Sequence, residues 1–381
     1  MILDKLFRLM AEKHASDIFI SAGAPIQIKI QGKTIPVNQQ IIDPETLQRM
    51  SGELLTPAQA EHLERAREIN VSRGVPEIGN FRINLFHQRG TIAIVVRFIT
   101  SEIPRLEDLG LPKVLSSVVM EQRGLVLVAG ATGSGKSTTI AAMIDHRSGQ
   151  RAGHILTVED PIEYLFRHRK SIVNQREVGQ DTHSFADALE NAMRQAPDCI
   201  LIGEIRDEAT MSLALAYAQT GHLCLATLHA SNSYRALSRI ANFFALEKRQ
   251  SLFVDLAASL RCIVSQRLVM AGDGKRVPAT EVLLNSRHIS ELIERGEIND
   301  IKEAMERSLA PGSQSFEQDL FRLYQEGTIG LDDALAHADS PTNLSWLINN
   351  AQSAPGTARA KLVPPIDQDP ADLPEPNLKL E

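Results

Sequence analysis

Two patterns of hydrophobic and polar positions divide this chain, and the change between them lies within residues 100–124. Before the change, apolar residues recur at helical spacing or alternate with polar residues; after it, short continuous apolar runs are separated by helical stretches. Alternation is typical of strands with one exposed face, whereas continuous runs are typical of strands buried on both faces. The pattern therefore predicts two domains of different construction.

The first pattern predicts a small α+β domain over residues 1–99. Helical spacing, alternation and prolines in first helical turns indicate its elements. They are helices at Ile2–Lys13, Pro44–Ser51 and Pro57–Ala66, strands at Asp17–Ser21 and Ile26–Ile30, and a hairpin of residues 81–86 and 92–99 around a turn at 88–90. Residues 100–112 contain two prolines and a weak pattern, so we expect an interdomain linker there.

The second pattern predicts an α/β domain over residues 113–350. Its continuous apolar runs favour a parallel sheet covered by helices, and helical spacing further on favours a C-terminal helical section. The apolar runs are 125–129, 154–158, 199–203 and 223–228, and the later helices are expected at 233–244, 247–266, 286–296 and 299–308. Residues 351–381 are acidic and rich in proline, which predicts a disordered tail.

A glycine-rich phosphate-binding loop follows the first apolar run. The motif GxxxxGK[ST] and the residue after it are Gly130, Ala131, Thr132, Gly133, Ser134, Gly135, Lys136, Ser137 and Thr138. Glycines let backbone N–H groups face phosphate oxygens, Lys136 offers a charge for the β- and γ-phosphates, and Ser137 offers a hydroxyl to Mg²⁺. The alternative is a chance glycine-rich turn, but the flanking strand and helix favour a nucleotide site.

Acidic clusters follow two further apolar runs. Glu159, Asp160 and Glu163 come after residues 154–158, and Glu204 comes after residues 199–203, close to Arg206. In doubly wound sheets, ligands bind beyond the carboxyl ends of the strands, so these groups are candidates to orient a water molecule or hold a metal. The alternative for each carboxylate is a solvated strand end or a helix N-cap.

The second acidic cluster departs from the usual motif of ATPases with such a loop. That motif ends its apolar run with Asp, whereas Gly203 and Glu204 stand here. Glu204 can still act on Mg²⁺ through a metal-bound water.

Two histidines flank the run at 223–228. His222 and His229 are seven positions apart, about 23 Å along a strand, so they cannot share one metal. His229 is expected at the carboxyl end, where it could sense the γ-phosphate. The alternative is that both are structural histidines with satisfied hydrogen bonds.

The composition limits which partners and which cellular compartment we expect for this protein. The 381 residues include 40 Lys+Arg and 47 Asp+Glu, a net charge of −7, which argues against nucleic acid as the main partner. The three cysteines form no CxxC pair, so neither a zinc site nor a disulfide framework is expected. With no signal peptide pattern and no apolar run near the ~20 residues of a membrane helix, we expect a cytoplasmic protein.

Several motifs in a fixed order resemble one family. They are GATGSGKST (130–138), ILTVEDPIEY (155–164), NQREVG (174–179), DCILIGEIRD (198–207) and TGHLCLATLHA (220–230). Over roughly residues 1–340 the chain resembles the PilT/PilU family of type IV pilus retraction ATPases, within the secretion ATPases.

The resemblance implies an assembly and an activity. Members form ring-shaped homohexamers of a PAS-like N-terminal domain and a RecA-like ATPase domain, and Mg²⁺-dependent ATP hydrolysis helps to extract pilin at the cytoplasmic face of the inner membrane. By resemblance, Glu163 is the water-activating glutamate and Glu204 the acid of the Walker B region. His222 and His229 then belong to the histidine box of the family.

The resemblance also points to arginines of the first domain. Family members bring such arginines to the nucleotide, and Arg82, Arg89 and Arg97 lie on the predicted hairpin. A guanidinium there would neutralise charge that develops on the γ-phosphate. The alternative is that they are exposed strand arginines.

Departures from the family pattern favour PilU-type members, which are regarded as accessory motors of PilT-type ATPases. The stretch His288–Arg295 replaces a helix needed for retraction and has Ser290 and Glu294 where that pattern has Arg. Ala131 replaces a proline, and the tail is acidic. The expected partners are a PilT-type ATPase and the inner-membrane platform protein. The alternative is an ATP-binding adaptor ring whose own hydrolysis is dispensable.

Overall fold

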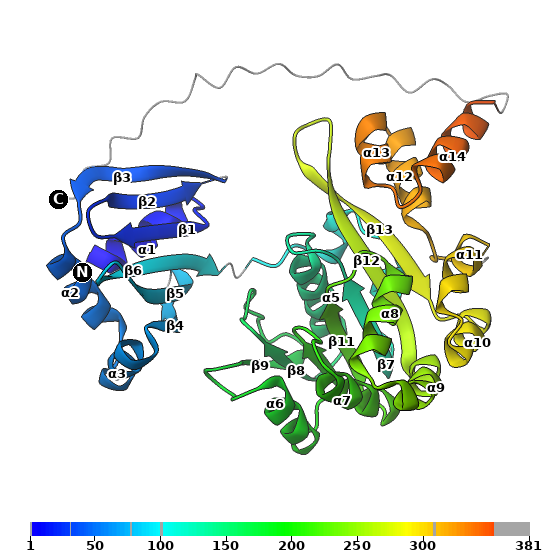
Figure 1. The fold of residues 1–381 in the computed structure, drawn as a ribbon, viewed down its shortest axis with the longest axis horizontal. Coiled ribbons are helices and arrows are strands. Elements are labelled where there is room, and N and C mark those ends of the chain that lie inside the picture. The colour runs from blue at the N-terminus through cyan, green and yellow to red at the C-terminus, as the bar shows by residue number, and fades with distance from the viewer. Residues whose placement is uncertain (1, 31, 77, 100–101, 308–309, 354–381) are drawn as a thin grey trace. The chain divides into compact units, whose positions relative to one another are not determined.

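The computed structural model describes residues 2–30, 32–76, 78–99, 102–307 and 310–353. The described residues form two compact units, one reaching Glu102 and the other containing most residues from Ile103 on (Figure 1). The predicted tail lies outside the described residues from position 354. The domain boundaries expected from the sequence stay predictions.

The first unit is a six-stranded antiparallel sheet in the order β3-β2-β1-β6-β5-β4 with three helices. Its strands are β1 (Asp17–Ser21), β2 (Pro25–Ile30), β3 (Lys33–Ile41), β4 (Glu68–Val75), β5 (Gly79–Gln88) and β6 (Thr91–Ile99). Its helices are α1 (Ile2–Glu12), α2 (Pro44–Leu54) and α3 (Pro57–Ala66). The predicted helices and the hairpin are confirmed, whereas β3 and β4 were not expected. A PAS-like character stays a prediction.

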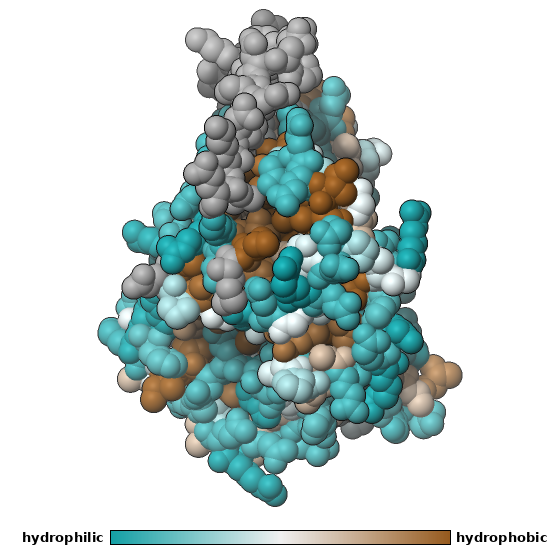
Figure 2. All heavy atoms as spheres, turned by 90° about the vertical axis from the view of Figure 1, so that its left-hand side faces the viewer, coloured by the Kyte–Doolittle hydropathy of each residue, from teal (hydrophilic) through white to brown (hydrophobic). Residues whose placement is uncertain are grey.

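Alternation and helix capping explain this unit. Alternate residues of the strands share one face and pack against α1, where the rings of Phe7 and Phe81 stack with centroids 4.3 Å apart. The Asp43 carboxylate accepts a hydrogen bond from the Thr46 N–H at 2.7 Å and so caps α2. Thr56 caps α3 in the same way. In Figure 2, hydrophilic residues cover much of the visible face, with smaller hydrophobic patches among them.

The second unit is a seven-stranded sheet in the order β13-β12-β7-β11-β10-β8-β9, parallel except for β13. Its strands are β7 (Gly124–Ala129), β8 (Gly153–Glu159), β9 (Ser171–Glu177), β10 (Cys199–Ile202), β11 (Leu223–Leu228), β12 (Leu260–Met270) and β13 (Arg276–Leu284). Its α-helices are α4 (Val114–Val118), α5 (Lys136–Gln150), α6 (Phe185–Ala192), α7 (Glu208–Gln219), α8 (Ser233–Phe243), α9 (Arg249–Ser259), α10 (Arg287–Arg295), α11 (Ile301–Glu306), α12 (Phe316–Gln325), α13 (Leu331–His337) and α14 (Pro341–Ser353). Short 3₁₀ helices are η1 (Leu106–Leu109), η2 (Met193–Gln195), η3 (Leu246–Lys248) and η4 (Ile298–Asp300).

Helices cover both faces of this sheet, as the continuous apolar runs predict. On β7, Leu125 and Leu127 belong to the hydrophobic cluster shared with α6 to α11, whereas Val126 and Val128 belong to the cluster shared with α4 and α5. Successive side chains of a strand point to opposite faces, so a strand between two helical layers is apolar at every position. The expected α/β class with a C-terminal helical section is confirmed.

One predicted helix is wrong in its second half. The helix expected at 247–266 ends at Ser259, and the residues from Leu260 on form β12, which pairs with β7 and with β13. Cys262, Ile263 and Val264 are all buried, and a short run that is apolar at every position has no period that separates a strand from a helix. Pairing with β7 therefore makes the segment from Leu260 on a strand.

The segment before the sheet belongs to the second unit. Of the linker expected at 100–112, residues 100–101 lie outside the description, and η1 lies within the remainder. Leu106 of η1 is buried in the cluster of α4 and α5. Among the described residues, no helix combines the length and the hydropathy needed to cross a membrane.

Helix α5 is anchored at its last turn by a buried charge. The Arg147 guanidinium is 2% exposed and donates hydrogen bonds to the Val119 carbonyl at 2.6 Å and the Glu121 carbonyl at 2.9 Å. Burial lowers the pKa of Arg147. These bonds fix the end of the helix that begins at the phosphate loop.

Replacing Arg147 by Ala is expected to lower the free energy of unfolding by about 3 kcal/mol, because the Val119 carbonyl, in a buried hydrogen bond, and the Glu121 carbonyl, in a partly buried one, lose their donor. Chemical denaturation of the purified chain measures this. The matched control is Arg287→Ala, whose side chain is 94% exposed in an ion pair with Glu291, and it is expected to cost less than about 0.5 kcal/mol. Equal costs for the two variants would refute the anchoring role of Arg147.

Candidate functional site

The carboxyl ends of four parallel strands bring the sequence candidates to one edge of the sheet. The phosphate loop follows β7, His229 follows β11, Glu204 lies just after β10, and Asp160 follows β8. In the sheet these strands lie in the order β7-β11-β10-β8. The side chains therefore line up along the edge where the carboxyl ends of the parallel strands meet, as expected for a doubly wound sheet.

The loop between β7 and α5 needs glycine at several positions. Gly133 and Gly135 have φ of +77° and +88°, a region that side chains rarely adopt. A Cβ at Gly130 would lie 2.6 Å from the backbone oxygen of Gln266, so no larger residue fits. The turn leads directly into α5, whose first N–H groups carry the positive end of the helix dipole.

Lys136 and Ser134 provide polar groups within the loop. The Lys136 ammonium is 8% exposed and donates to the carbonyls of Gly130 at 2.9 Å and Ala131 at 2.8 Å. The Ser134 hydroxyl is buried and has no hydrogen-bond partner among the described residues. A buried donor of this kind fits a phosphate oxygen. Ser137 and Thr138, in the first turn of α5, complete the motif.

Glu204 stands at the centre of a charged chain. One carboxylate oxygen accepts from Arg206 Nε at 2.7 Å, and the other lies 3.2 Å from His229 Nε2. Arg206 also lies 3.4 Å from Asp160 Oδ2. The hydrogen bond to Glu204 raises the pKa of Arg206. The structure thus joins Asp160, Arg206, Glu204 and His229, although the sequence alone did not predict their pairing.

Glu159 and Glu163 occupy different environments. The Glu159 carboxylate is 8% exposed and accepts from the Thr157 hydroxyl at 2.6 Å and from Gln175 at 3.1 Å, so it points back toward the sheet. Glu163 lies in the loop between β8 and β9, and its side chain is exposed. The structure therefore leaves Glu163 accessible to solvent and holds Glu159 in place.

The two histidines lie at opposite ends of β11, as predicted. The His222 Nδ1 atom lies 3.2 Å from the Thr220 hydroxyl and 3.3 Å from the Tyr217 carbonyl, and its ring meets the Tyr217 ring edge-on. His222 is therefore remote from the phosphate loop, at the amino end of the strand. His229 alone belongs to the edge that carries Glu204.

The arginines of the first unit lie on the β5–β6 hairpin. Arg82 and Arg97 are directly paired across the two strands, and Arg97 forms an ion pair of 2.9 Å with the buried Asp17. Arg89 is exposed at the turn, with φ of +47°. Their approach to the nucleotide stays a prediction.

A cavity of about 490 Å³, which no sequence pattern predicted, adjoins the phosphate loop. Gly135, Thr138 and Gln266 line its loop side, and Leu111 and Leu268 are among its apolar residues. Pockets of this size, mostly apolar with a few polar groups, are typical of small-molecule sites. The cavity can accept the base and sugar of a nucleotide whose phosphates lie on the loop.

Gln266 is a further residue of the site that sequence reasoning missed. Its side chain is 3% exposed and contacts Ser134 and Thr139. The position fell within the segment expected to be helical, so no signal linked it to the loop.

The described residues contain no cluster of side chains typical of a structural metal site. Among the residues that the structure describes, no group of three or more His, Cys, Asp or Glu side chains could hold an ion. Cys199, Cys224 and Cys262 are free and buried, and burial raises the pKa of Cys199 and Cys262 to about 12. These thiols are therefore unreactive core residues.

Comparison with curated proteins gives close relatives. Residues 1–311 match the model of a family described as type II/IV secretion system proteins. The chain is 46% identical over 349 residues to the type IV pilus ATPase PilU of Pseudomonas aeruginosa, with 91% of each protein covered. It is 36% identical over 343 residues to the type IV pilus retraction ATPase PilT of the same organism, covering 90% of this chain and 100% of that protein.

Solved structures agree with these relatives. A crystal structure of the pilus retraction motor PilT with bound ADP matches with a TM-score of 0.84 and 39% identity, covering 90% of this chain and 98% of that one. The ATPase DotB of Legionella pneumophila matches with a TM-score of 0.76 and 27% identity, covering 92% and 96%. The chain therefore belongs to the type II/IV secretion system protein family, among the type IV pilus ATPases of the PilT/PilU group.

Proposed function

We propose that this protein hydrolyses ATP to ADP and phosphate in order to power or assist the retraction of type IV pili. The observation that carries the proposal is the phosphate loop and the Glu204–His229 pair at one edge of a single sheet. This arrangement provides phosphate binding and acidic groups in one place, which are the parts that phosphoryl transfer needs. The cavity beside the loop supplies room for the nucleoside.

Each group has a distinct role in the proposal. Lys136 and the loop N–H groups neutralise the β- and γ-phosphates, and the Ser137 hydroxyl is the protein ligand of Mg²⁺. Glu204 would hold the metal through a water molecule, because Mg²⁺ usually keeps several waters when it binds to a protein. Mg²⁺, when bound, would supply positive charge that offsets the negative charge of the phosphates. Glu163, exposed in its loop, would orient the attacking water.

His229 is the proposed sensor of the γ-phosphate. Its Nε2 atom shares the Glu204 carboxylate with Arg206, so loss of negative charge beside Glu204 changes the balance among these three groups. The histidine then reports hydrolysis to the segment that follows β11. His222, at the far end of the strand, is proposed as a structural member of the histidine box.

We place the protein in a homohexameric ring at the cytoplasmic face of the inner membrane, at the pilus base. Arg82, Arg89 and Arg97 are the proposed source of a guanidinium that reaches a neighbouring subunit's nucleotide. The partners would be a PilT-type ATPase and the membrane platform protein, with no nucleic acid and no zinc. The acidic net charge supports this choice of partners over nucleic acid.

Helix α10 supports an accessory role beside a PilT-type motor. The Ser290 hydroxyl donates to the Ala257 carbonyl at 3.0 Å, so this position ties α10 to α9. Glu294, also on α10, has an exposed side chain and presents a negative charge. In the helix pattern needed for retraction, these two positions carry arginines. In this chain the same surface carries a neutral Ser290 and a negatively charged Glu294.

Lys136→Ala is expected to weaken ADP binding by at least about 100-fold, because the β-phosphate loses its paired cation. Titration with a fluorescent ADP derivative measures the dissociation constant. Lys136→Gln tests whether a neutral donor suffices, and Lys170→Ala, an exposed lysine of the same unit, should bind like the wild type. Wild-type affinity in Lys136→Ala would refute the site.

Glu163→Gln is expected to lower kcat for ATP by roughly 100-fold or more while ADP affinity changes less than about twofold, because a general base contributes to the chemical step alone. Phosphate release under saturating ATP gives kcat. Glu190→Gln, an exposed carboxylate on α6, is the control. If kcat in Glu163→Gln equals that of the wild type, another group activates the water.

An assay of pilus retraction in cells distinguishes a ring whose own ATP hydrolysis is needed from an ATP-binding adaptor. In a strain that lacks the wild-type copy but retains its PilT-type ATPase, Lys136→Ala is expected to fail to restore twitching motility, because hydrolysis drives the contribution of this ring. Motility zones on agar and the amount of folded protein are measured together. Full restoration by a folded Lys136→Ala variant would instead favour an adaptor whose hydrolysis is dispensable.

A further inference from the structure

We propose that Gln266 is a positioning residue that holds the phosphate loop in its nucleotide-binding shape from the side of β12. The inference rests on the proposed function, since it deepens the account of the same site. Strand β12 lies beside β7 in the sheet, and Ser265 is paired with Ala129, the last residue before the loop. Gln266 therefore lies level with the start of the loop.

The Gln266 amide bridges two parts of the loop region. Its Nε2 atom donates to the Ser134 carbonyl at 2.8 Å, and its Oε1 atom accepts from the Thr139 hydroxyl at 2.7 Å. Both bonds are buried, so water does not compete for them. One side chain thus fixes the tip of the loop relative to the first turn of α5.

The same residue also leaves little space for a side chain at two glycines of the loop. A Cβ at Gly130 would lie 2.6 Å from the Gln266 backbone oxygen, and a Cβ at Gly135 would lie 2.6 Å from its Nε2 atom. Both distances are shorter than real Cβ contacts. The loop therefore packs directly on β12 behind its phosphate-binding side, and Gln266 supplies both the steric wall and the hydrogen bonds.

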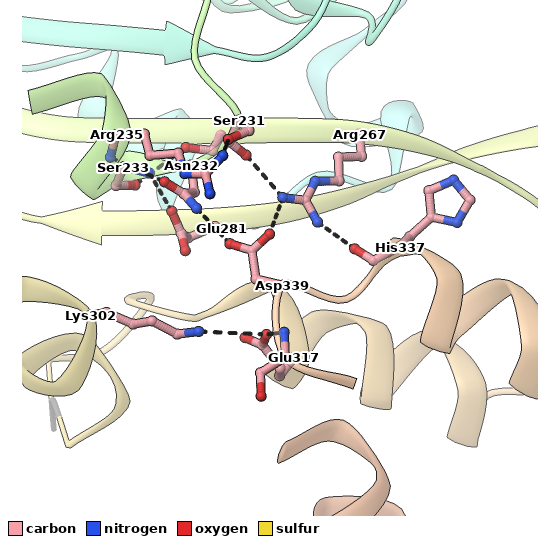
Figure 3. Close-up of polar contacts among 12 residues, drawn as sticks. Ser231, Asn232, Ser233, Arg235, Arg267, Glu281, Lys302, Glu317, His337 and Asp339 are labelled. Atoms are coloured by element: carbon pink, nitrogen blue, oxygen red, sulfur yellow. Dashed lines mark hydrogen bonds and ion pairs between the residues drawn. The ribbon is translucent and has the colours of Figure 1, made fainter. Parts of the chain in front are cut away.

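The next residue fixes Gln266 in turn. Figure 3 shows Arg267 reaching from β12 to the Ser231 carbonyl, to the His337 carbonyl and to Asp339. Asp339 also accepts from Asn232 Nδ2 at 2.6 Å, and the Arg267 guanidinium lies 3.9 Å from the centre of the Phe316 ring. Adjacent residues of a strand face opposite sides, so Arg267 secures the strand from the side away from the loop.

This arrangement has a chemical consequence. Phosphate binding depends on backbone N–H groups that converge on one point, and such convergence is lost when the loop relaxes. Because Ser134 and Gly135 supply neighbouring N–H groups, a bond to the Ser134 carbonyl fixes the peptide plane that carries the Gly135 N–H. Gln266 acts on phosphate binding through this peptide plane.

The test is ADP affinity of the purified full chain, measured with a fluorescent N-methylanthraniloyl derivative of ADP. Gln266→Met keeps the volume but removes both hydrogen bonds, and we expect its dissociation constant to rise roughly tenfold. The matched control is Gln314→Met. The Gln314 amide bonds the Thr280 carbonyl and hydroxyl at 3.0 Å each, away from the loop, so its loss should leave ADP affinity within about twofold of wild type.

A pH profile separates the hydrogen bond from a general packing role. In Gln266→Glu, an ionised carboxylate cannot donate to the Ser134 carbonyl, but a protonated one can. Burial raises the pKa of such a carboxyl, so the ratio of variant to wild-type dissociation constants should fall between about pH 8 and about pH 6. A ratio that stays constant over this range would contradict the donor role, and Gln266→Met should show no such change.

A second variant covers the case in which Gln266→Met does not fold. Thr139→Val removes only the hydroxyl that donates a hydrogen bond to Gln266. We expect it to lower ADP affinity less than Gln266→Met does, and the effects of the two substitutions should not be additive. Wild-type affinity in folded Gln266→Met, or additive effects of the two positions, would overturn the inference. Failure of the wild type itself to bind ADP would instead overturn the proposed function, so the two failures are distinguishable.

Discussion

The pairing of β7 with β11 on one side and β12 on the other is the constraint on which the rest of the second unit depends. Every residue of β7 is buried, and its two faces meet two different helical layers. Because β7 is paired on both sides, the chain can leave the sheet only before the first residue or after the last residue of this strand. The phosphate loop therefore starts from the centre of the sheet, between the strand that leads to His229 and the strand that carries Gln266. Its position is fixed before any ligand contributes.

The same parallel order gathers the charged groups. Glu204 and His229 follow adjacent strands and lie 3.2 Å apart, while Arg206 extends the chain of polar contacts to Asp160 beyond β8. Arg206 holds Glu204 from the side opposite His229, so the carboxylate is oriented by two partners. An acid oriented in this way can hold a metal-bound water at a fixed place, which is what the proposed reaction requires. The fold thus supplies both the loop and the oriented acid through strand order alone.

The parts of the site predicted from the sequence are those encoded by neighbouring residues. The phosphate loop, the acidic clusters and the placement of His222 and His229 at opposite ends of one strand follow from local motifs and from the direction of parallel strands. Gln266 could not be found in this way, because its partners lie 127 and 132 positions away and its strand was mistaken for the end of a helix. The apolar residues of β12 gave no period that separates the two structures. Similarly, the predicted hairpin carries Arg82 and Arg97, which the structure pairs across β5 and β6, but no local motif indicated the contact of Arg97 with Asp17, 80 positions away.

The measurement that tests the central claim most directly is steady-state release of phosphate from ATP by the purified full chain, with Mg²⁺ and with the metal removed by EDTA. The account predicts turnover that requires Mg²⁺, because Ser137 and Glu204 act on the nucleotide through that ion. A folded protein that binds ADP but releases no phosphate in the presence of Mg²⁺, both alone and with a PilT-type ATPase added, would contradict it.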